Sequence, residues 1–313
     1  MQRSKRTGDY LTVPNTSSKT ERCGYCAIIG RPDAGKSTLM NHLIGQKISI
    51  TSRKPQTTRD RIRGYVTDER GQIIFTDTPG LAELKGGLGK YMISGIKKAV
   101  SDADVIVVVC VPAYRIHDED RLILDTLKDI GKPVLLCLNK IDIFEKSLVE
   151  KSLKMYMDYY GNGEITALSA LKDINTDALL DRIYECLPEG PFLYDPDYST
   201  DETVRDIASE IVREKALRLL RDEVPHGIAV VVEDVREKPG IMHIDAVIYC
   251  ERESHKGIII GKGARMIKKI GTDARTDIEK LADTRVNLNL RVKVRPDWKD
   301  SPSALREFGY TDV

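Results

Sequence analysis

The sequence predicts an α/β protein of two domains, and three observations support this. First, 313 residues are more than a single hydrophobic core usually holds. Second, apolar strand-like runs alternate with helical stretches through the first 190 residues, which is typical of a mainly parallel sheet covered by helices. Third, "PEGPFLYDPDYS" (188–199) is rich in proline, glycine and aspartate and indicates a linker. We expect a tail (1–22), a first domain (23–190), a linker (191–200) and a second domain (201–313).

The first domain is predicted from five apolar runs that read as strands, at 26–29, 72–75, 105–111, 134–138 and 164–168. Helical stretches separate most of them, for example 36–45 and 120–131. Continuous apolar runs such as "VIVVVCV" (105–111) are typical of parallel strands buried on both faces. They are far shorter than the roughly 20 residues of a membrane-spanning helix, so we expect no such span.

The second domain is predicted from the element order α-β-β-α-α-β. An amphipathic helix begins near residue 204, and two strands are expected near 228–235 and 242–251. After the glycine- and lysine-rich stretch of the 260s we expect a short helix, then a second helix through 273–282. The last strand alternates over 286–294, with Val and Leu on one face and Asn, Arg and Lys on the other. Trp298 is expected to anchor the exit of this strand.

Composition and charge narrow the class of protein. Apolar residues make up 41% and charged residues 31%, which indicates a soluble globular protein, and the net charge of +1 means that nucleic-acid affinity must come from local patches. Six scattered cysteines do not suggest a disulfide-stapled secreted domain. The pair Cys23 and Cys26 runs into a strand, whereas a redox pair needs a helix N-terminus. Residues 1–22 read as a disordered, mildly basic tail without a signal segment, so we expect a cytoplasmic location.

A phosphate-binding loop is predicted at "GRPDAGKS" (30–37), which fits G-x-x-x-x-G-K-[ST] between a strand and a helix. Glycines let backbone N–H groups surround phosphate oxygens, and the helix N-terminus adds partial positive charge. In this pattern Lys36 reaches the β- and γ-phosphates, and Ser37 binds Mg²⁺. The residues expected to hold the nucleotide here are Gly30, Asp33, Ala34, Gly35, Lys36, Ser37 and Thr38. By itself the loop leaves ATPases, kinases and GTPases open.

The motif "DTPG" (77–80) follows a strand and completes the phosphate side of the site. Asp77 can hold Mg²⁺ through water, and the N–H of Gly80 can contact the γ-phosphate. The polar stretch "SRKPQTTRDR" (52–61) is the predicted switch segment, in which Thr58, with Thr57 as the alternative, caps Mg²⁺ and senses the γ-phosphate. We expect Lys36, Thr58 and Gly80 to act in catalysis, and Ser37, Thr58 and Asp77 to hold the metal.

Two further motifs select guanine. "NKID" (139–142) ends the strand "VLLCL", so that Asn139 and Asp142 can bind the guanine edge while the stem of Lys140 covers the base. "SAL", which is Ser169, Ala170 and Leu171, ends the strand "EITAL", where the Ala170 N–H can meet the guanine O6. Each motif is weak alone, but four in this order at strand ends predict a GTP site, because ligands of such sheets gather at the carboxyl ends of the strands.

These motifs, together with "GIIIGKGARMIKK" (257–269) and "WKDSPSALREFGY" (298–310), resemble the Era family of GTPases over residues 26–310. The resemblance implies a P-loop GTPase domain with a mostly parallel sheet, followed by an α+β type II KH domain. It implies binding of GTP or GDP with Mg²⁺, binding near the 3′ end of small-subunit ribosomal RNA, and a role in assembling the small ribosomal subunit. It also implies peripheral association with the inner face of the cell membrane. We expect a monomer.

The sequence departs from related patterns in three places. Family P-loops usually read Asn-Val where this chain has Asp33 and Ala34, and that Asn is associated with a monovalent cation, often K⁺, that assists hydrolysis. Asp33 still offers oxygens to K⁺ but adds negative charge near the phosphates. Ras-like enzymes place a Gln after the DxxG motif, whereas Leu81 cannot orient water, so slow intrinsic hydrolysis is expected. The G-x-x-G pattern of a KH loop ends here in Ala264 instead of Gly.

The second loop is predicted to clamp the sugar-phosphate backbone of RNA. Residues 252–269 hold six basic groups against a single acid, Glu253. The apolar "IIIG" run (258–261) is expected to line the core under the loop. The candidate RNA-binding residues are Lys256, Gly261, Lys262, Gly263, Ala264, Arg265, Lys268 and Lys269. The alternative is a membrane-associated signalling GTPase whose C-terminal domain docks protein or lipid, and a P-loop kinase is disfavoured because NKID and SAL would then have no purpose.

Overall fold

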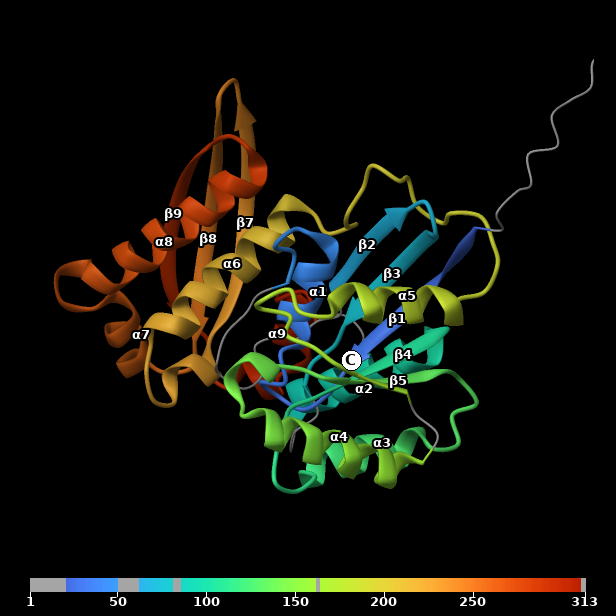
Figure 1. The fold of residues 1–313 in the computed structure, drawn as a ribbon. Coiled ribbons are helices and arrows are strands. Elements are labelled where there is room, and N and C mark those ends of the chain that lie inside the picture. The colour runs from blue at the N-terminus through green and yellow to red at the C-terminus, as the bar shows by residue number, and fades with distance from the viewer. Residues whose placement is uncertain (1–20, 50–61, 81–85, 162–163, 311–313) are drawn as a thin grey trace, which may run out of the picture.

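The computed structural model describes residues 21–49, 62–80, 86–161 and 164–310. These residues form a six-stranded sheet and a separate three-stranded sheet, each with its own helices (Figure 1). The α/β class and the two-part architecture are as predicted. None of the helices in the described ranges is both long and apolar enough to cross a membrane.

The first domain, or G domain, has the strand order β2-β3-β1-β4-β5-β6, with every neighbouring pair parallel except β2 and β3. The strands are β1 (Arg22–Ile29), β2 (Ile62–Asp68), β3 (Gly71–Asp77), β4 (Val105–Cys110), β5 (Val134–Leu138) and β6 (Glu164–Ala167). Its helices are α1 (Lys36–Ile44), α2 (Gly86–Asp102), α3 (Asp118–Leu127), α4 (Lys146–Tyr160) and α5 (Thr176–Cys186), with the short turn η1 (Ile141–Ile143). The cores place α1 and α5 on one face of the sheet and α2, α3 and α4 on the other.

Two details of this sheet differ from the prediction. Strand β2 is an additional edge strand that pairs antiparallel with β3, and β1 begins at Arg22 rather than Cys26. The sequence of β2, "IRGYVTD", mixes polar and apolar residues because an edge strand has only one neighbour, so it lacks the continuous apolar run of the central strands. Cys23 and Cys26 both lie buried on β1 as free thiols.

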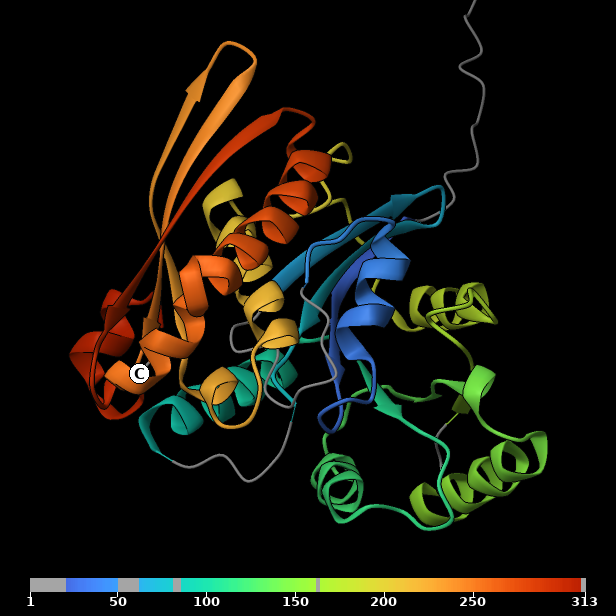
Figure 2. The same ribbon diagram turned by 90° about the vertical axis from the view of Figure 1, so that its left-hand side faces the viewer.

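The second domain, or KH domain, has the predicted order α-β-β-α-α-β. It consists of α6 (Val204–Leu219), η2 (Val224–Gly227), β7 (Ala229–Lys238), β8 (Ile241–Cys250), α7 (Glu253–Ile260), η3 (Lys262–Ala264), α8 (Arg265–Ala282), β9 (Arg285–Val294), η4 (Trp298–Asp300) and α9 (Pro302–Glu307). Strand β8 pairs antiparallel with β7 and parallel with β9. Helices α6 and α8 pack together on one face of this sheet (Figure 2).

The predicted positions of the two central helices were wrong. One helix, α7, precedes the glycine loop, and a single continuous helix, α8, follows it, where we expected two helices after the loop. The run "III" is the last turn of α7: Ile259 is buried in the core, while Ile258 is half-exposed. A helix turns only one side inward, so the run does not line the core as a whole.

A cluster of aromatic and apolar side chains joins the two domains. Leu88, Tyr91 and Met92 of α2 share a buried cluster with residues of the C-terminal segment, among them Trp298 and Leu305. Trp298 is fully buried and its Nε1–H donates to the carbonyl of Gly227 over 3.0 Å, in line with its expected anchoring role. Helix α2 of the G domain therefore contacts the C-terminal segment of the KH domain directly.

Candidate nucleotide site and RNA-binding surface

The P-loop connects β1 to α1 at the carboxyl edge of the sheet. Gly30 has φ of +154°, and a Cβ there would lie 2.5 Å from the carbonyl oxygen of Val109. Gly35 has φ of +96°, and a Cβ there would lie 2.4 Å from Nδ2 of Asn139. Both glycines are therefore required by close approach as well as by backbone conformation.

Lys36 and Ser37 open α1, with Thr38 behind them. Lys36 is only 6% exposed, and its Nζ donates to the carbonyl of Arg31 over 3.1 Å. Burial lowers the pKa of the Lys36 ammonium, and the carboxylates of Asp77 and Asp33 act in the opposite direction. A buried ammonium held by one loop carbonyl at a helix N-terminus is a strong attractor for phosphate.

The hydroxyl of Ser37 donates to Oδ2 of the fully buried Asp77 over 2.6 Å. A hydroxyl and a carboxylate held together suit Mg²⁺, which prefers oxygen ligands and keeps several waters or phosphate oxygens in its shell. Within the described ranges, no group of three or more His, Cys, Asp and Glu could hold a metal. The donor set thus fits a magnesium ion that is bound jointly by protein and phosphate.

Asp33 adopts the left-handed conformation, with φ of 61°, at the exposed tip of the P-loop. Partial desolvation raises the pKa of its carboxyl, while Lys140, Lys36 and Arg31 oppose that shift. Three cations thus attract this carboxylate, but desolvation outweighs them.

Asp120 is a buried carboxylate under the P-loop that the sequence analysis missed. It accepts from the hydroxyl of Tyr156 over 2.8 Å, and one of its oxygens lies 3.4 Å from Nε of Arg31. Burial raises the pKa of the Asp120 carboxyl, with Tyr156 and Arg31 acting against that shift. Its signal was present, because Asp120 occupies the buried stripe of α3 together with Ile123 and Leu124. An acid on an apolar helix face indicates a buried partner.

Asn139 ties the phosphate side to the base side. The side chain is 2% exposed; its Nδ2 donates to the carbonyl of Ala34 over 3.0 Å, and its Oδ1 accepts from the N–H of Ala170 over 3.0 Å. The N–H of Lys140 also donates to Oδ1, over 2.8 Å. The structure thus engages the Ala170 N–H with Asn139 rather than leaving it directed at a guanine O6, and Asn139 acts as a strut between loops.

Asp142 lies in η1, where its Oδ1 accepts from the hydroxyl of Ser169 over 2.6 Å. Lys140 is left-handed, with φ of 66°, and its Nζ contacts the carbonyl of Asp33. Leu171 is 73% exposed beside this loop. The structure therefore brings together Asn139, Lys140, Asp142 and the SAL residues, and it orients the Asp142 carboxylate by a fixed hydroxyl.

Gly80 is the last residue of the DTPG motif. A Cβ at this buried position would lie 2.8 Å from the nitrogen of Pro32, so the motif packs directly on the P-loop. The hydroxyl of Thr78 fixes the turn by donating to the carbonyl of Ile28 over 2.9 Å. Thr57, Thr58 and Leu81 lie outside the described residues.

The candidate RNA loop, residues 261–264, connects α7 to α8. Gly261, Gly263 and Ala264 all have positive φ, of 70°, 61° and 59°. A Cβ at Gly261 would lie 2.8 Å from Cβ of Met266, whereas Gly263 faces open space. Ala264 carries its methyl in a conformation that favours glycine. The backbone of the loop thus follows a glycine-type path through its last position.

Basic side chains surround this loop. Lys262, Arg265 and Lys268 are exposed and form no ion pair with the described residues. Two further lysines are partly neutralised. Lys256 lies 3.9 Å from Glu253, and Lys269 lies 3.2 Å from Asp273, one helical turn further on. The first turn of α8 contains no acid, so the positive end of an 18-residue helix adds to the patch.

Comparison with known proteins identifies the family of the chain. A protein-family model described as "50S ribosome-binding GTPase" matches residues 25–140, and one described as "KH domain" matches residues 223–299. GTPase Era of Clostridium novyi is 47% identical over 292 residues, which are 93% of this chain and 99% of that protein. The chain belongs to the Era family of GTPases. Its enzymatic class, a GTPase, is the predicted one.

Solved Era structures agree with the fold. A crystal structure of Aquifex aeolicus Era, as a variant bound to GDP·AlF4⁻, has a TM-score of 0.89 and 41% identity, covering 92% of this chain and 99% of that chain. A crystal structure of Era in complex with MgGDPNP and nucleotides 1506–1542 of 16S ribosomal RNA also has a TM-score of 0.89, at 40% identity, covering 93% and 99%. The predicted order of a P-loop GTPase domain and a type II KH domain is confirmed.

Proposed function

We propose that this Era-family GTPase binds small-subunit ribosomal RNA near its 3′ end through the KH domain, and that GTP binding and hydrolysis time its action in assembling the small ribosomal subunit. The observation that carries the proposal is the presence of two separate phosphate-binding loops on adjoining domains, at 30–37 and 261–264. A relative of nearly the same length and fold has been solved with MgGDPNP and a 16S rRNA segment, which supports the same pairing here.

At the nucleotide site, each residue has a distinct role. Lys36 and the P-loop N–H groups bind the phosphates, the hydroxyl of Ser37 and the carboxylate of Asp77 would hold Mg²⁺, and Gly80 senses the γ-phosphate from the DTPG turn. Mg²⁺, when bound, neutralises charge on the β- and γ-phosphates. Thr58 remains a prediction as the switch residue.

Guanine selectivity follows from Asp142. A carboxylate accepts from the N1–H and the exocyclic amine of guanine, whereas adenine offers no matching pair of donors. The 2.6 Å hydrogen bond from Ser169 fixes one carboxylate oxygen and so reduces the entropy lost on binding. Leu171 and the aliphatic stem of Lys140 offer apolar surface to the faces of the base.

Hydrolysis is expected to be slow and to respond to K⁺. No residue equivalent to a water-orienting Gln follows the DTPG motif, so another group must supply that role. Asp33 stands where the family's cation-associated Asn is usual, and its oxygens lie at the tip of the P-loop among three cations. We therefore include K⁺ as a stimulating ion of the reaction.

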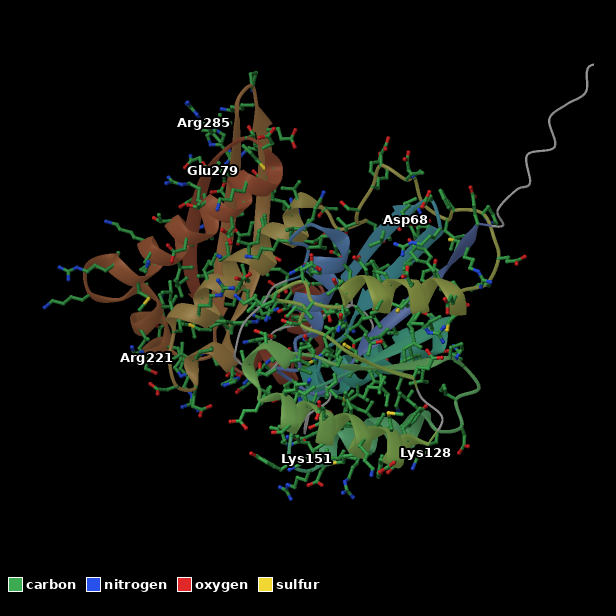
Figure 3. All side chains as sticks on the ribbon, viewed as in Figure 1. Asp68, Lys128, Lys151, Arg221, Glu279 and Arg285 are labelled. Atoms are coloured by element: carbon green, nitrogen blue, oxygen red, sulfur yellow. The ribbon has the colours of Figure 1, made fainter. Side chains whose placement is uncertain are left out.

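At the KH loop, Lys262, Arg265 and Lys268 neutralise phosphates while Gly261 and Gly263 let the RNA backbone approach closely. A double variant, Lys262→Glu with Lys268→Glu, should reduce affinity for a single-stranded RNA matching the 3′ end of 16S rRNA by at least about 100-fold and leave GDP affinity unchanged, measured by fluorescence anisotropy and calorimetry. The control is Lys151→Glu with Lys154→Glu on α4, the same change of charge on an exposed helix of the G domain; Figure 3 shows Lys151 pointing outward, far from the KH domain.

Unchanged RNA affinity in the first double variant would refute the RNA-binding part of the proposal. The membrane association that the family resemblance implies is a separate prediction. It is tested by flotation of the wild-type chain with vesicles of anionic phospholipid. Vesicle binding that the same double variant abolishes, without any RNA binding by the wild type, would favour the membrane-associated alternative.

A further inference from the structure

The short segment Lys47–Ser49 follows α1 and is held tightly to it. Asn41 of α1 accepts from the N–H groups of Ile48 and Ser49 over 2.9 and 2.8 Å, and its Nδ2 donates to the carbonyl of Ser49 over 2.6 Å. Three hydrogen bonds from one side chain fix the backbone of this segment relative to the P-loop helix. A displacement of α1 must therefore move residues 47–49 with it.

On one side, this segment contacts the magnesium carboxylate. The hydroxyl of Ser49 donates to Oδ2 of Asp77 over 2.7 Å, and both side chains are fully buried. The same Oδ2 accepts from Ser37 over 2.6 Å. Because a buried carboxylate is directed by its donors, Ser49 helps to set the direction in which Asp77 presents its oxygens.

On the other side, the segment reaches into the KH domain. Nζ of Lys47 lies 2.8 Å from Oε2 of Glu214 on α6 and 2.8 Å from Oδ2 of Asp277 on α8. Glu214 is fully buried, whereas the side chains of Lys47 and Asp277 are 34% and 24% exposed. Lys215 and Arg218 also pair with these acids, so the KH domain keeps as many cations as acids in this cluster without Lys47.

Helix α8 extends this contact to the RNA loop. It runs without interruption from Arg265, directly after the loop, to Ala282. Asp277 lies 12 residues beyond Arg265, about 18 Å along the helix axis. A single helix therefore joins Asp277, one of the two acids that hold Lys47, to the backbone that is proposed to clamp RNA.

We propose that residues 47–49 couple the two phosphate-binding loops: Ser49 is a positioning residue for Asp77, and Lys47 transmits the state of the nucleotide site to α6 and α8 of the KH domain. This inference rests on the proposed function, which supplies the RNA. Binding of Mg²⁺ and triphosphate at the P-loop changes the direction in which Asp77 must present its oxygens. Because Ser49 is hydrogen-bonded to Asp77, residues 47–49 pass this change on to Lys47. RNA affinity then depends on the nucleotide through this contact.

The test of Lys47 compares RNA affinity in two nucleotide states. In the wild type, affinity for the 16S 3′-end oligonucleotide should differ at least about fivefold between Mg·GDP and Mg·GMPPNP. Lys47→Met keeps the aliphatic stem and removes the charge, so the ratio should fall below about twofold while GDP affinity stays unchanged. Lys151→Met is the matched control and should keep the wild-type ratio. The effects of Lys47→Met and Asp277→Asn on this affinity ratio should not add in the double variant, because both substitutions remove the same ion pair.

The test of Ser49 is its effect on magnesium linkage. Ser49→Ala should lower the Mg²⁺-dependent gain in GDP affinity by about 5- to 10-fold. The control is Ser152→Ala, another fully buried serine, whose hydroxyl bonds to the backbone of Ala113 and which should affect stability without changing the magnesium gain. An unchanged magnesium gain in Ser49→Ala would overturn its positioning role.

Hydrogen exchange gives a readout that needs no RNA. Addition of Mg·GMPPNP should change amide exchange in α6 and α8 of the wild type but not of Lys47→Met. If the wild type shows this change and binds no RNA, the proposed function fails and the coupling stands. If RNA binds but Lys47→Met keeps both the affinity ratio and the exchange response, the coupling is refuted and the function stands.

Discussion

Replacement of Asn139 by alanine tests the strut that joins the phosphate and base sides of the nucleotide site. The side chain is 2% exposed and takes part in three hydrogen bonds, with the carbonyl of Ala34 and the N–H groups of Ala170 and Lys140. Alanine leaves the buried groups of Ala34 and Ala170 without this partner. Since an unsatisfied buried group costs about 1–3 kcal/mol, we expect the free energy of unfolding of the G domain to fall by about 2–4 kcal/mol.

Urea unfolding of the full chain without nucleotide measures this loss. A two-domain protein can unfold in two steps, and the G-domain step is the one that added Mg·GDP shifts to higher urea. Calorimetry with GDP gives the second readout, in which we expect affinity to fall at least about tenfold because the two loops lose their common support.

A matched control is Asn289→Ala on the KH sheet. Its exposed amide donates a single hydrogen bond of 2.8 Å to Asp245, so stability should change by less than about 1 kcal/mol and GDP affinity should not change. If Asn139→Ala loses less than about 1 kcal/mol and binds GDP like the wild type, the strut does not hold the site together.

Four further outcomes follow from the site and the domain contact. Asp142→Asn should change the base preference from guanine to xanthine, because the amide donates where the carboxylate accepts. Competition between GDP and xanthosine diphosphate measures the preference. Asp33→Asn should bind GTP more tightly at low salt and show larger stimulation of turnover by K⁺ over Na⁺, because it removes a carboxylate near the phosphates. Ala264→Gly should stabilise the KH domain by about 1 kcal/mol, since it removes an L-residue from the left-handed region, and thermal unfolding measures the gain. Burial raises the pKa of Asp277, but hydrogen bonds from Lys215 and Lys47 lower it to about 2. The carboxylate therefore contributes roughly 2 kcal/mol of stability above its unfolded pKa near 4, and this contribution is lost as pH falls toward 2. In urea unfolding from pH 5 downward, the difference in stability between the wild type and Asp277→Asn should shrink accordingly.

The parts of the site that lie at strand ends could be predicted from the sequence. In a parallel sheet the carboxyl ends of strands share one edge, so motifs that follow β1, β3, β5 and β6 must meet there whatever the details of packing. Asn139 therefore reaches Ala34 across 105 residues of sequence, as the spacing of motifs suggests. The specific partner of its amide was not predictable, because hydrogen bonds among loops depend on atomic packing.

The features that escaped prediction depend on non-local contacts. Lys47 and Asp277 are separated by 230 residues, and no local pattern marks either of them as part of an ion pair. The helix α7 was missed because a run of three isoleucines suits a strand as well as a helix. The burial of Ile259 beside a half-exposed Ile258 distinguishes the helix, and the sequence does not show it. Strand β2 was missed because it has no continuous apolar run. It lies at the edge of the sheet, where it pairs with β3 alone.

The two departures from the family pattern share a backbone feature but act through different physics. Asp33 and Ala264 both occupy the left-handed region, at φ of 61° and 59°. Aspartate tolerates this region almost as well as asparagine, so the change at 33 leaves the loop path intact and alters only the charge near the phosphates. Alanine adds no charge, but its Cβ is unfavourable there, so the change at 264 alters the conformational energy of the RNA loop alone. Effects of Asp33 must therefore weaken as salt screens charge, whereas effects of Ala264 must persist at every ionic strength.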